Sequence, residues 1–316
     1  MSQVGQQVTP RRFRGLPATQ VCGRRVPVAV NRVSRLLGLA LLAEGHVLIE
    51  DYPGVGKTAL ARALARSLGA EYARIQCTVD LLPADVIGTN LFNQREARFD
   101  FRPGPVFANI VLVDEINRTS PKTQSGLLEC MQERQVTVDK QLHELARPFM
   151  VIATQNPIEY EGTYALPEAQ LDRFMVQLAL GYPDPAAEAD MLATHGGRDV
   201  VLDLEPVADV GTVLAAQAAA ADVHGSEALR RYVVALCGTT REDSRAELGA
   251  SPRAALLLFR AAKALAALEG RDHALPDDVQ ALAHSVLEHR LLMAPGATPD
   301  DRRAIIADAL EQVPAL

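Results

Sequence analysis

One short segment of the chain combines glycines, a lysine and a threonine at a spacing that suits phosphate binding. The apolar residues 47–49 predict a buried strand, residues 53–56 a tight turn, and residues 59–65 a helix. Backbone N–H groups of such a turn and of the following helix N-terminus can surround a phosphate. The residues that we expect to contact the phosphates of a nucleotide are Pro53, Gly54, Val55, Gly56, Lys57, Thr58 and Ala59.

Two polar side chains of this segment carry the chemistry. Lys57 supplies positive charge for the outer phosphate oxygens, and the Thr58 hydroxyl can bind Mg²⁺. One residue departs from the usual pattern, because Asp51 stands where phosphate-binding loops normally begin with glycine. A plain Gly/Pro turn before an amphipathic helix is the alternative explanation of the segment.

A second apolar run ends on two adjacent acids. Residues 109–113 predict a central strand of a parallel sheet, because such strands are buried on both faces. Asp114 at its carboxyl end can hold Mg²⁺, and Glu115 can polarise a water molecule aimed at a γ-phosphate. A strand that ends in acids often only meets solvent, but together with Lys57 and Thr58 the pair predicts a site for ATP or a near relative.

Composition narrows the class of protein. A chain of 316 residues with 48% hydrophobic residues can form two domains with a large core. The net charge of −7 argues against a generally nucleic-acid-binding surface. The four cysteines have no metal-binding spacing, which indicates reduced thiols in a cytoplasmic protein. The sequence has no signal-peptide pattern and no apolar run long enough to cross a bilayer, so we expect no membrane insertion.

The order of the predicted elements indicates an α/β fold followed by a helical domain. Predicted strands alternate with helices up to about residue 182, which is typical of a parallel sheet with helices on both faces. After that the chain is rich in Ala and Leu and shows no convincing strand. We therefore expect a flexible leader at residues 1–20, a nucleotide-binding α/β core at 21–182, and an all-α domain at 183–316.

Four smaller elements can be predicted within these domains. Residues 90–102 and 135–145 alternate apolar and polar residues and predict two hairpins inserted into the core, although ordinary surface ribbons are an alternative. In the helical domain, residues 252–269 predict a helix with Ser251 as its N-cap, and residues 276–290 predict another.

Three further polar residues are candidates for the site. Asn156 follows a predicted strand at 149–154, which places its amide at the carboxyl edge of the sheet, where open α/β folds bind ligands. Arg173 directly follows Asp172 in an amphipathic turn, and a surface charge pair is the simpler explanation. Arg253 lies in the first turn of a helix, where the helix dipole disfavours a cation, and could reach back toward a nucleotide between the domains.

Taken together, these motifs resemble the MoxR family of AAA+ ATPases over nearly the whole chain. The resemblance implies an AAA+ P-loop core with a helical lid domain, and a nucleotide site for ATP and Mg²⁺. The segments that carry it are Gly54-Val55-Gly56-Lys57-Thr58, Val113-Asp114-Glu115-Ile116-Asn117-Arg118, Ala153-Thr154-Gln155-Asn156-Pro157, the stretch from Leu166 to Phe174, and Gly249-Ala250-Ser251-Pro252-Arg253-Ala254.

The resemblance also implies a role for single residues. Asp114 and Thr58 would bind the magnesium ion, and Glu115 would be the catalytic base. Asn156 matches the residue called sensor 1. Arg173 matches the arginine finger that reaches the nucleotide of a neighbouring subunit. Two further matches complete the set, namely Arg253 with sensor 2 and Gly23 with the segment beside the adenine.

The same resemblance implies partners. Members of this family form rings, often hexamers, and act as chaperone-like motors on a client protein complex. They commonly work with a protein that has a von Willebrand factor A domain, in complex assembly or metal insertion. A nucleic-acid motor of the helicase-like AAA+ branch is the alternative function, because those helicases share both hairpin insertions. The negative net charge argues against a nucleic-acid partner for this chain.

Overall fold

The computed structural model describes residues 20–21, 24–25, 28–156, 163–183, 185–195 and 200–315. The leader predicted at residues 1–20 lies outside these ranges except for its last residue. Gly23, expected beside the adenine, also lies outside them. Among the described residues, none of the helices combines the length and the apolar character that crossing a membrane would require.

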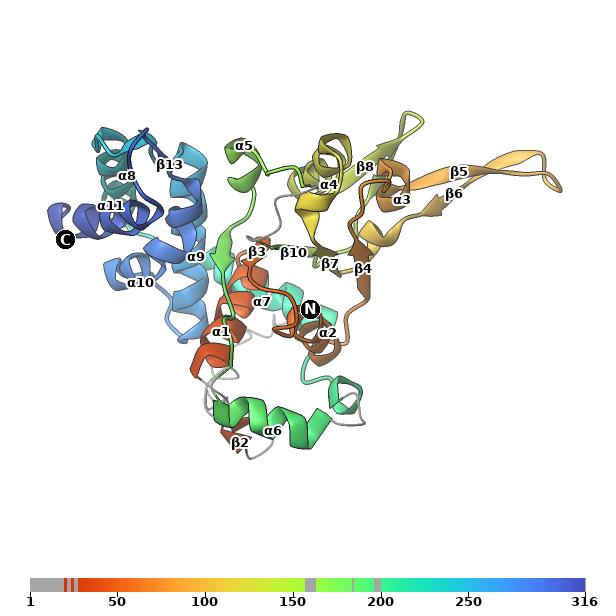
Figure 1. Cartoon of the computed structure of the whole chain (residues 1–316), viewed down its shortest axis with the longest axis horizontal. Helices are drawn as coiled ribbons and strands as arrows, with labels where there is room; N and C mark the ends of the chain where they lie inside the picture. Colours follow the sequence, from red (N-terminus) through yellow and green to blue (C-terminus); the bar gives the residue numbers. More distant parts are fainter. Residues whose placement is uncertain are drawn as a thin grey trace, which may run out of the picture.

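A five-stranded sheet forms the centre of the first half of the chain (Figure 1). Its strand order is β11-β3-β10-β7-β4, and every neighbouring pair runs parallel. The strands are β3 (Val47–Glu50), β4 (Tyr72–Gln76), β7 (Ile110–Asp114), β10 (Met150–Gln155) and β11 (Val176–Leu178).

Helices cover both faces of this sheet, as predicted. Alternate residues of one strand point to opposite faces. Val47 and Ile49 belong to one apolar cluster, and Leu48 between them belongs to another. The first cluster includes residues of α1 (Val28–Leu42) and α2 (Lys57–Ser67), and the second includes residues of α3 (Pro83–Ile87) and α4 (Pro121–Glu133). Burial on both faces explains why these strands are continuously apolar.

The second half of the chain is mainly helical and packs beside the sheet, opposite the first hairpin (Figure 1). Its helices are α6 (Pro185–His195), α7 (Val210–Asp222), α8 (Glu227–Glu242), α9 (Pro252–Leu268), α10 (Pro276–Leu287) and α11 (Pro299–Gln312). The predicted start of α9 is confirmed, because the Ser251 hydroxyl accepts a hydrogen bond from the Ala254 N–H at 3.0 Å.

Two details of this half differ from the sequence prediction. The helix expected at 276–290 ends at Leu287, and η5 (Glu288–Arg290) continues it as a single 3₁₀ turn. The short strands β12 (Ala246–Leu248) and β13 (Leu292–Met293) pair antiparallel, although no strand was expected after residue 183. Strands of two or three residues are too short to show the alternation on which such predictions depend.

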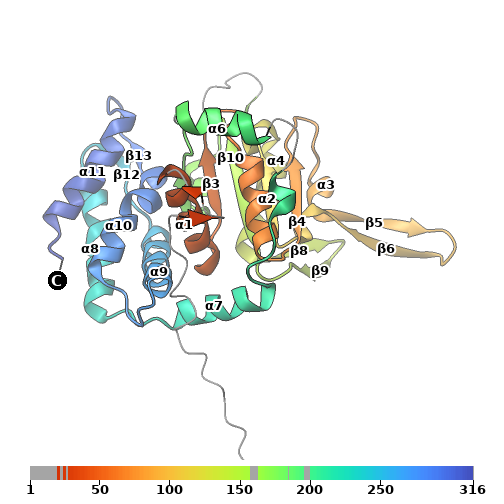
Figure 2. The same cartoon turned by 90° about the horizontal axis from the view of Figure 1, so that it is seen from below.

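Both predicted hairpins are present. The first consists of β5 (Gly88–Asn93) and β6 (Arg98–Pro103), and it projects away from the sheet (Figure 2). The second consists of β8 (Gln135–Val138) and β9 (Gln141–Glu144). The His143 ring stacks on the Phe101 ring with centroids 3.8 Å apart, and Asn90 Nδ2 donates to Asp139 Oδ2 at 2.7 Å. Side-chain contacts therefore join the two hairpins near the sheet.

A buried histidine connects three elements at the amino end of β3. His46 Nδ1 accepts a hydrogen bond from the Val151 N–H of β10 at 2.9 Å, so this nitrogen carries no proton. Its Nε2 then donates to the Met131 carbonyl of α4 at 3.0 Å. Burial disfavours the charged imidazolium and lowers the pKa of His46 to about 4.

This histidine makes the fold sensitive to acid. The unfolded chain binds the proton more tightly than the folded chain, so stability rises with pH between about 4 and the ordinary value of 6.5. We expect His46 to account for a loss of about 2 kcal/mol in the free energy of unfolding between pH 7 and pH 5. Urea unfolding at both pH values should give a smaller pH effect in His46→Gln than in the wild type. Equal pH effects in the two proteins would contradict the assignment.

Candidate nucleotide-binding and hydrolysis site

The predicted phosphate loop connects β3 to α2. Gly54 and Gly56 have φ angles of +82° and +90°, a region that side chains with a Cβ rarely adopt. No heavy atom outside the loop lies within 4 Å of where a Cβ would stand on either glycine, so the backbone angles, and not crowding, select glycine. Lys57 is the first residue of α2, with Gly56 as the N-cap, and its Nζ donates to the Asp51 carbonyl at 2.7 Å.

This loop fits the phosphates of a nucleotide. Its glycines leave the concave side of the backbone open, and the N-terminus of α2 offers N–H groups that are not used within the helix. Thr58 and Asp114 offer a hydroxyl and a carboxylate, which are the oxygen ligands that Mg²⁺ prefers. Lys57, Thr58 and Asp114 could therefore hold a magnesium–nucleotide complex.

Asp51, the departure from the usual loop pattern, has a structural role. It is buried, and its Oδ1 accepts from the Tyr52 N–H at 2.8 Å. Its Oδ2 accepts from the N–H groups of Leu180 and Gly181 at 2.6 and 2.7 Å. The Tyr52 ring stacks on Tyr182, with centroids 5.2 Å apart. The carboxylate thus joins the start of the loop to the chain leaving β11, which a glycine could not do.

The two acids of the second motif stand at the carboxyl end of β7. Asp114 Oδ1 accepts a hydrogen bond from the Thr154 hydroxyl at 2.6 Å, and its Oδ2 accepts from Arg74 at 2.6 Å. The Thr154 hydroxyl in turn accepts from the Glu115 N–H at 2.9 Å. Thr154 therefore aligns both acids, a role that its sequence position did not reveal.

Glu115 adopts a conformation that is unfavourable for a residue with a Cβ. Its φ and ψ are 58° and 52°, in the left-handed region, which costs on the order of 1 kcal/mol. Its Oε2 accepts hydrogen bonds from Gln76 of β4 at 3.1 Å and from Arg118 at 3.0 Å. Such strain is concentrated at functional sites, and the two donors fix the direction of the carboxylate.

Asn156 completes this edge of the sheet. It follows β10 directly and is buried. The residue before it, Gln155, pairs with Glu50 of β3, at the start of the phosphate loop. Because β3, β10 and β7 are adjacent and parallel, the loop, Asn156 and the acidic pair meet at one edge. The structure thus brings together the candidates Lys57, Thr58, Asp114, Glu115 and Asn156.

The two candidate arginines lie at the opposite edge of the sheet. Arg173 precedes β11 and shares a surface pocket with Gln132 and Glu129 of α4. Arg253, the second residue of α9, donates to Gln132 Oε1 at 3.3 Å. Its charge also contributes to the lowered pKa of His46, at the amino end of β3. Both arginines therefore belong to one surface near the end of α4.

This position bears on one expectation from the sequence, that Arg253 could reach back toward a nucleotide between the domains. Arg253 packs near the amino end of β3, whereas the phosphate loop of its own chain follows the carboxyl end of that strand. A residue that packs at the amino end of a parallel strand is separated from that loop by the length of the strand, at about 3.3 Å per residue. The unfavourable position of Arg253 in the helix dipole marked it as unusual but did not indicate which edge of the sheet it faces.

The role found for Asp51 can be tested by introducing the consensus residue. Asp51→Gly removes the acceptor of three backbone N–H groups, and hydrogen bonds to a charged group contribute about 1.5–3 kcal/mol each. We expect the variant to be several kcal/mol less stable in urea unfolding, although its loop is closer to the usual pattern. Asp51→Asn, which keeps one acceptor oxygen, should lose less. A variant as stable as the wild type would contradict this role.

Family models match both halves of the chain. Residues 46–176 match the family model described as the ATPase family associated with various cellular activities (AAA). Residues 238–309 match a model described as the AAA lid domain. The first model spans strands β3, β4, β7 and β10 and includes Lys57, Thr58, Asp114, Glu115, Asn156 and Arg173. The second spans α9, which carries Arg253, together with α10 and most of α11.

Relatives and a solved structure agree with these models. The chain is 50% identical over 273 residues to the uncharacterized protein YeaC of Bacillus subtilis, covering 86% of this chain and 85% of YeaC. It is 40% identical over 309 residues to the chaperone MoxR1 of Mycobacterium tuberculosis, covering 93% and 81%. A crystal structure of a proposed ATPase from Cytophaga hutchinsonii superposes with a TM-score of 0.83 at 39% identity, covering 90% and 89%. The chain therefore belongs to the MoxR family of AAA+ ATPases.

Proposed function

We propose that this ATPase hydrolyses ATP with Mg²⁺ in order to remodel or assemble a client protein complex. The observation that carries the proposal is the meeting of the phosphate loop, the strained Glu115 and Asn156 at one sheet edge. There the Thr154 hydroxyl bonds the Asp114 carboxylate and the Glu115 backbone N–H. ATP and Mg²⁺ are its cofactors. The name of the relative MoxR1 supports a chaperone-like use of the energy.

The first part of the mechanism is binding of the phosphates. The turn 53–56 and the first residues of α2 direct N–H groups to the phosphate oxygens, and Lys57 neutralises charge on the outer ones. Thr58 and Asp114 would hold the magnesium ion, which would neutralise charge that develops on the phosphates. Arg74 pairs with the Asp114 carboxylate at 2.6 Å, so a magnesium ion held by Asp114 would compete with this guanidinium.

The second part is activation of water. Glu115 is the proposed base, because its carboxylate stands at the end of β7 beside Asp114 and is oriented by Gln76 and Arg118. Asn156 is the proposed partner of the γ-phosphate and the attacking water, since its amide can donate to one and accept from the other. Phosphoryl transfer depends mainly on such positioning and on charge neutralisation.

The third part requires a neighbouring subunit. Arg173 and Arg253 are too far from the phosphate loop of their own chain to act there, since they lie at the other edge of the sheet. We propose that both act on the nucleotide bound by the adjacent copy in a ring, with a hexamer as the expected size. The division into a core at 21–182 and a lid at 183–316 is part of this proposal.

The proposed setting is the cytoplasm, with a partner that has a von Willebrand factor A domain and helps select the client. Metal insertion into an enzyme is one form that the assembly step could take.

The alternative of a nucleic-acid motor is not adopted. The projecting first hairpin exposes three large apolar side chains (Leu91, Phe92 and Phe99) beside charged residues of both signs (Arg95, Glu96, Arg98 and Arg102). An exposed apolar cluster of this kind suits contact with a protein surface better than with a phosphate backbone.

The base can be tested by a substitution that preserves shape. Glu115→Gln keeps the size of the side chain and one acceptor oxygen but removes the basic carboxylate, so turnover should fall by about 10²–10⁴-fold. The affinity for a fluorescent ATP analogue should remain within about threefold of the wild-type value, because the substitution leaves the phosphate loop intact. Glu311→Gln, on an exposed part of α11, serves as the control. Wild-type turnover in Glu115→Gln would rule out this assignment.

Action between subunits can be tested by mixing two inactive variants. Lys57→Ala should lose nucleotide binding but retain its arginines, and Arg173→Ala should bind nucleotide but lose the finger, worth on the order of 10³–10⁵ in rate. Mixed assemblies contain interfaces with one intact nucleotide site and one intact arginine, so the ATPase rate should recover in the mixture. A co-assembled mixture that stays inactive would argue that Arg173 does not act on a neighbour.

A further inference from the structure

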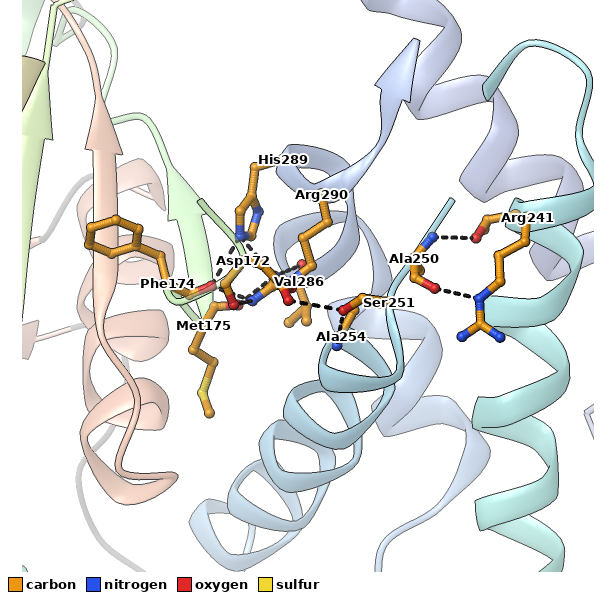
Figure 3. A network of polar contacts seen from close by, with 11 residues as sticks. Asp172, Phe174, Met175, Arg241, Ala250, Ser251, Ala254, Val286, His289 and Arg290 are labelled. Carbon is orange, nitrogen blue, oxygen red and sulfur yellow. Dashed lines mark hydrogen bonds and ion pairs between the residues drawn. The ribbon is translucent and has the colours of Figure 1, made fainter. Parts of the chain in front are cut away.

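A buried ion pair connects the core to the helical part of the chain (Figure 3). Arg290, at the end of η5, has a side chain that is only 1% exposed, and its Nε donates to Asp172 Oδ1 at 2.8 Å. Asp172 lies 118 residues earlier, in the turn before β11. The two residues thus join segments that are distant in sequence, across the boundary between sheet and helices.

The remaining donors of Arg290 are also used. The guanidinium donates to the carbonyls of Asp172 at 3.3 Å and Met175 at 3.4 Å, and to those of Phe174 and Val286. Next to it, His289 Nε2 lies 3.1 Å from the Phe174 carbonyl. A buried charge is tolerated only with such compensation, and removing one partner leaves the other uncompensated. The segment 172–175 is therefore held along its backbone as well as through Asp172.

A serine extends this connection to α9. The Ser251 hydroxyl donates to Asp172 Oδ2 at 3.0 Å and accepts from the Ala254 N–H at 3.0 Å (Figure 3). The residue that caps α9 therefore also contacts the core. We call Asp172, Arg290 and Ser251 the core–lid clasp.

The clasp stands between the two arginines proposed to act on a neighbouring subunit. Arg173 follows Asp172 directly, and Arg253 lies two residues after Ser251. Because Arg290 takes the charge of Asp172, neither arginine forms an ion pair with a carboxylate in the part of the chain that the structure describes. One network therefore sets the position of both arginines, and no carboxylate among the described residues neutralises either guanidinium.

We propose that Asp172, Arg290 and Ser251 are positioning residues, which hold Arg173 and Arg253 together as one unit for the nucleotide of the adjacent subunit. This inference rests on the proposed action between subunits. The core edge that carries Arg173 and the start of α9 then move as one body. Misplacement of either arginine by about 1 Å would reduce the rate by about 10²-fold without affecting the phosphate loop.

The test is Arg290→Gln, examined by turnover, nucleotide affinity and subunit mixing. We expect the rate to fall by about 10²-fold, with affinity for a fluorescent ATP analogue within about threefold of the wild type. Mixing with Lys57→Ala should restore activity, because the Arg290→Gln subunits keep intact nucleotide sites. Mixing with Arg173→Ala should not, because both variants then lack a well-placed arginine. If Arg290→Gln simply failed to fold, neither mixture would regain activity.

Two controls match the substitutions. Arg245→Gln also removes an arginine ion pair, but that arginine binds Asp243 and Asp308 within the helical part. We therefore expect Arg245→Gln to turn over ATP at the wild-type rate. Ser251→Ala provides a milder break of the clasp, and Ser226→Ala is its control. Ser226 caps α8 through the Leu229 N–H at 3.0 Å, the same geometry as Ser251. In the described part of the chain it makes no hydrogen bond with Asp172 or Arg290. We expect a rate loss of about tenfold for Ser251→Ala alone.

The outcomes separate this inference from the proposed function. If the mixture of Arg173→Ala with Lys57→Ala recovers activity but Arg290→Gln and Ser251→Ala turn over like their controls, the clasp has no positioning role. The same follows if Arg290→Gln is inactive and is not rescued by Lys57→Ala. If Arg173→Ala is itself not rescued, the proposed action between subunits is wrong, and the inference that rests on it is wrong with it.

Discussion

The parallel direction of adjacent strands is the constraint on which the site depends. Because β3, β10 and β7 run the same way, the residues that follow them meet at one edge of the sheet. Asp114 and Thr154 are 40 residues apart in sequence, yet a 2.6 Å hydrogen bond joins them there. Reversing one strand would move its polar end to the other edge, roughly 15 Å away, and would separate the acids from the phosphate loop.

The same constraint excludes the arginines from the site of their own chain. Arg173 and Arg253 pack near the end of α4, at the amino edge of the sheet. On the proposed mechanism each chain therefore supplies a nucleotide site at one edge and an arginine pair at another, and neither is sufficient alone. Assembly and hydrolysis then become coupled, because a subunit is active only when a neighbour faces its phosphate loop.

Buried charges occur where distant segments of the chain have to meet. Asp51 connects the phosphate loop to the exit of β11, and Arg290 connects the turn before β11 to the helical part. Each is surrounded by hydrogen-bond partners, without which its burial would cost several kcal/mol. Apolar contacts could hold these segments together, but they are less directional. We interpret the two charges as devices that select one arrangement of the segments beside the site.

The sequence by itself determined most of the helices and strands and the residue types on which the proposed site is built. Glycine at positions of positive φ, apolar strands buried on both faces and a serine cap are local features, so Gly56, residues 110–113 and Ser251 could be interpreted without a structure. Only the tertiary structure decided which side chains pair. Two such contacts join distant segments, namely Thr154 with Asp114 and Asp172 with Arg290. Residue type and local spacing do not predict them.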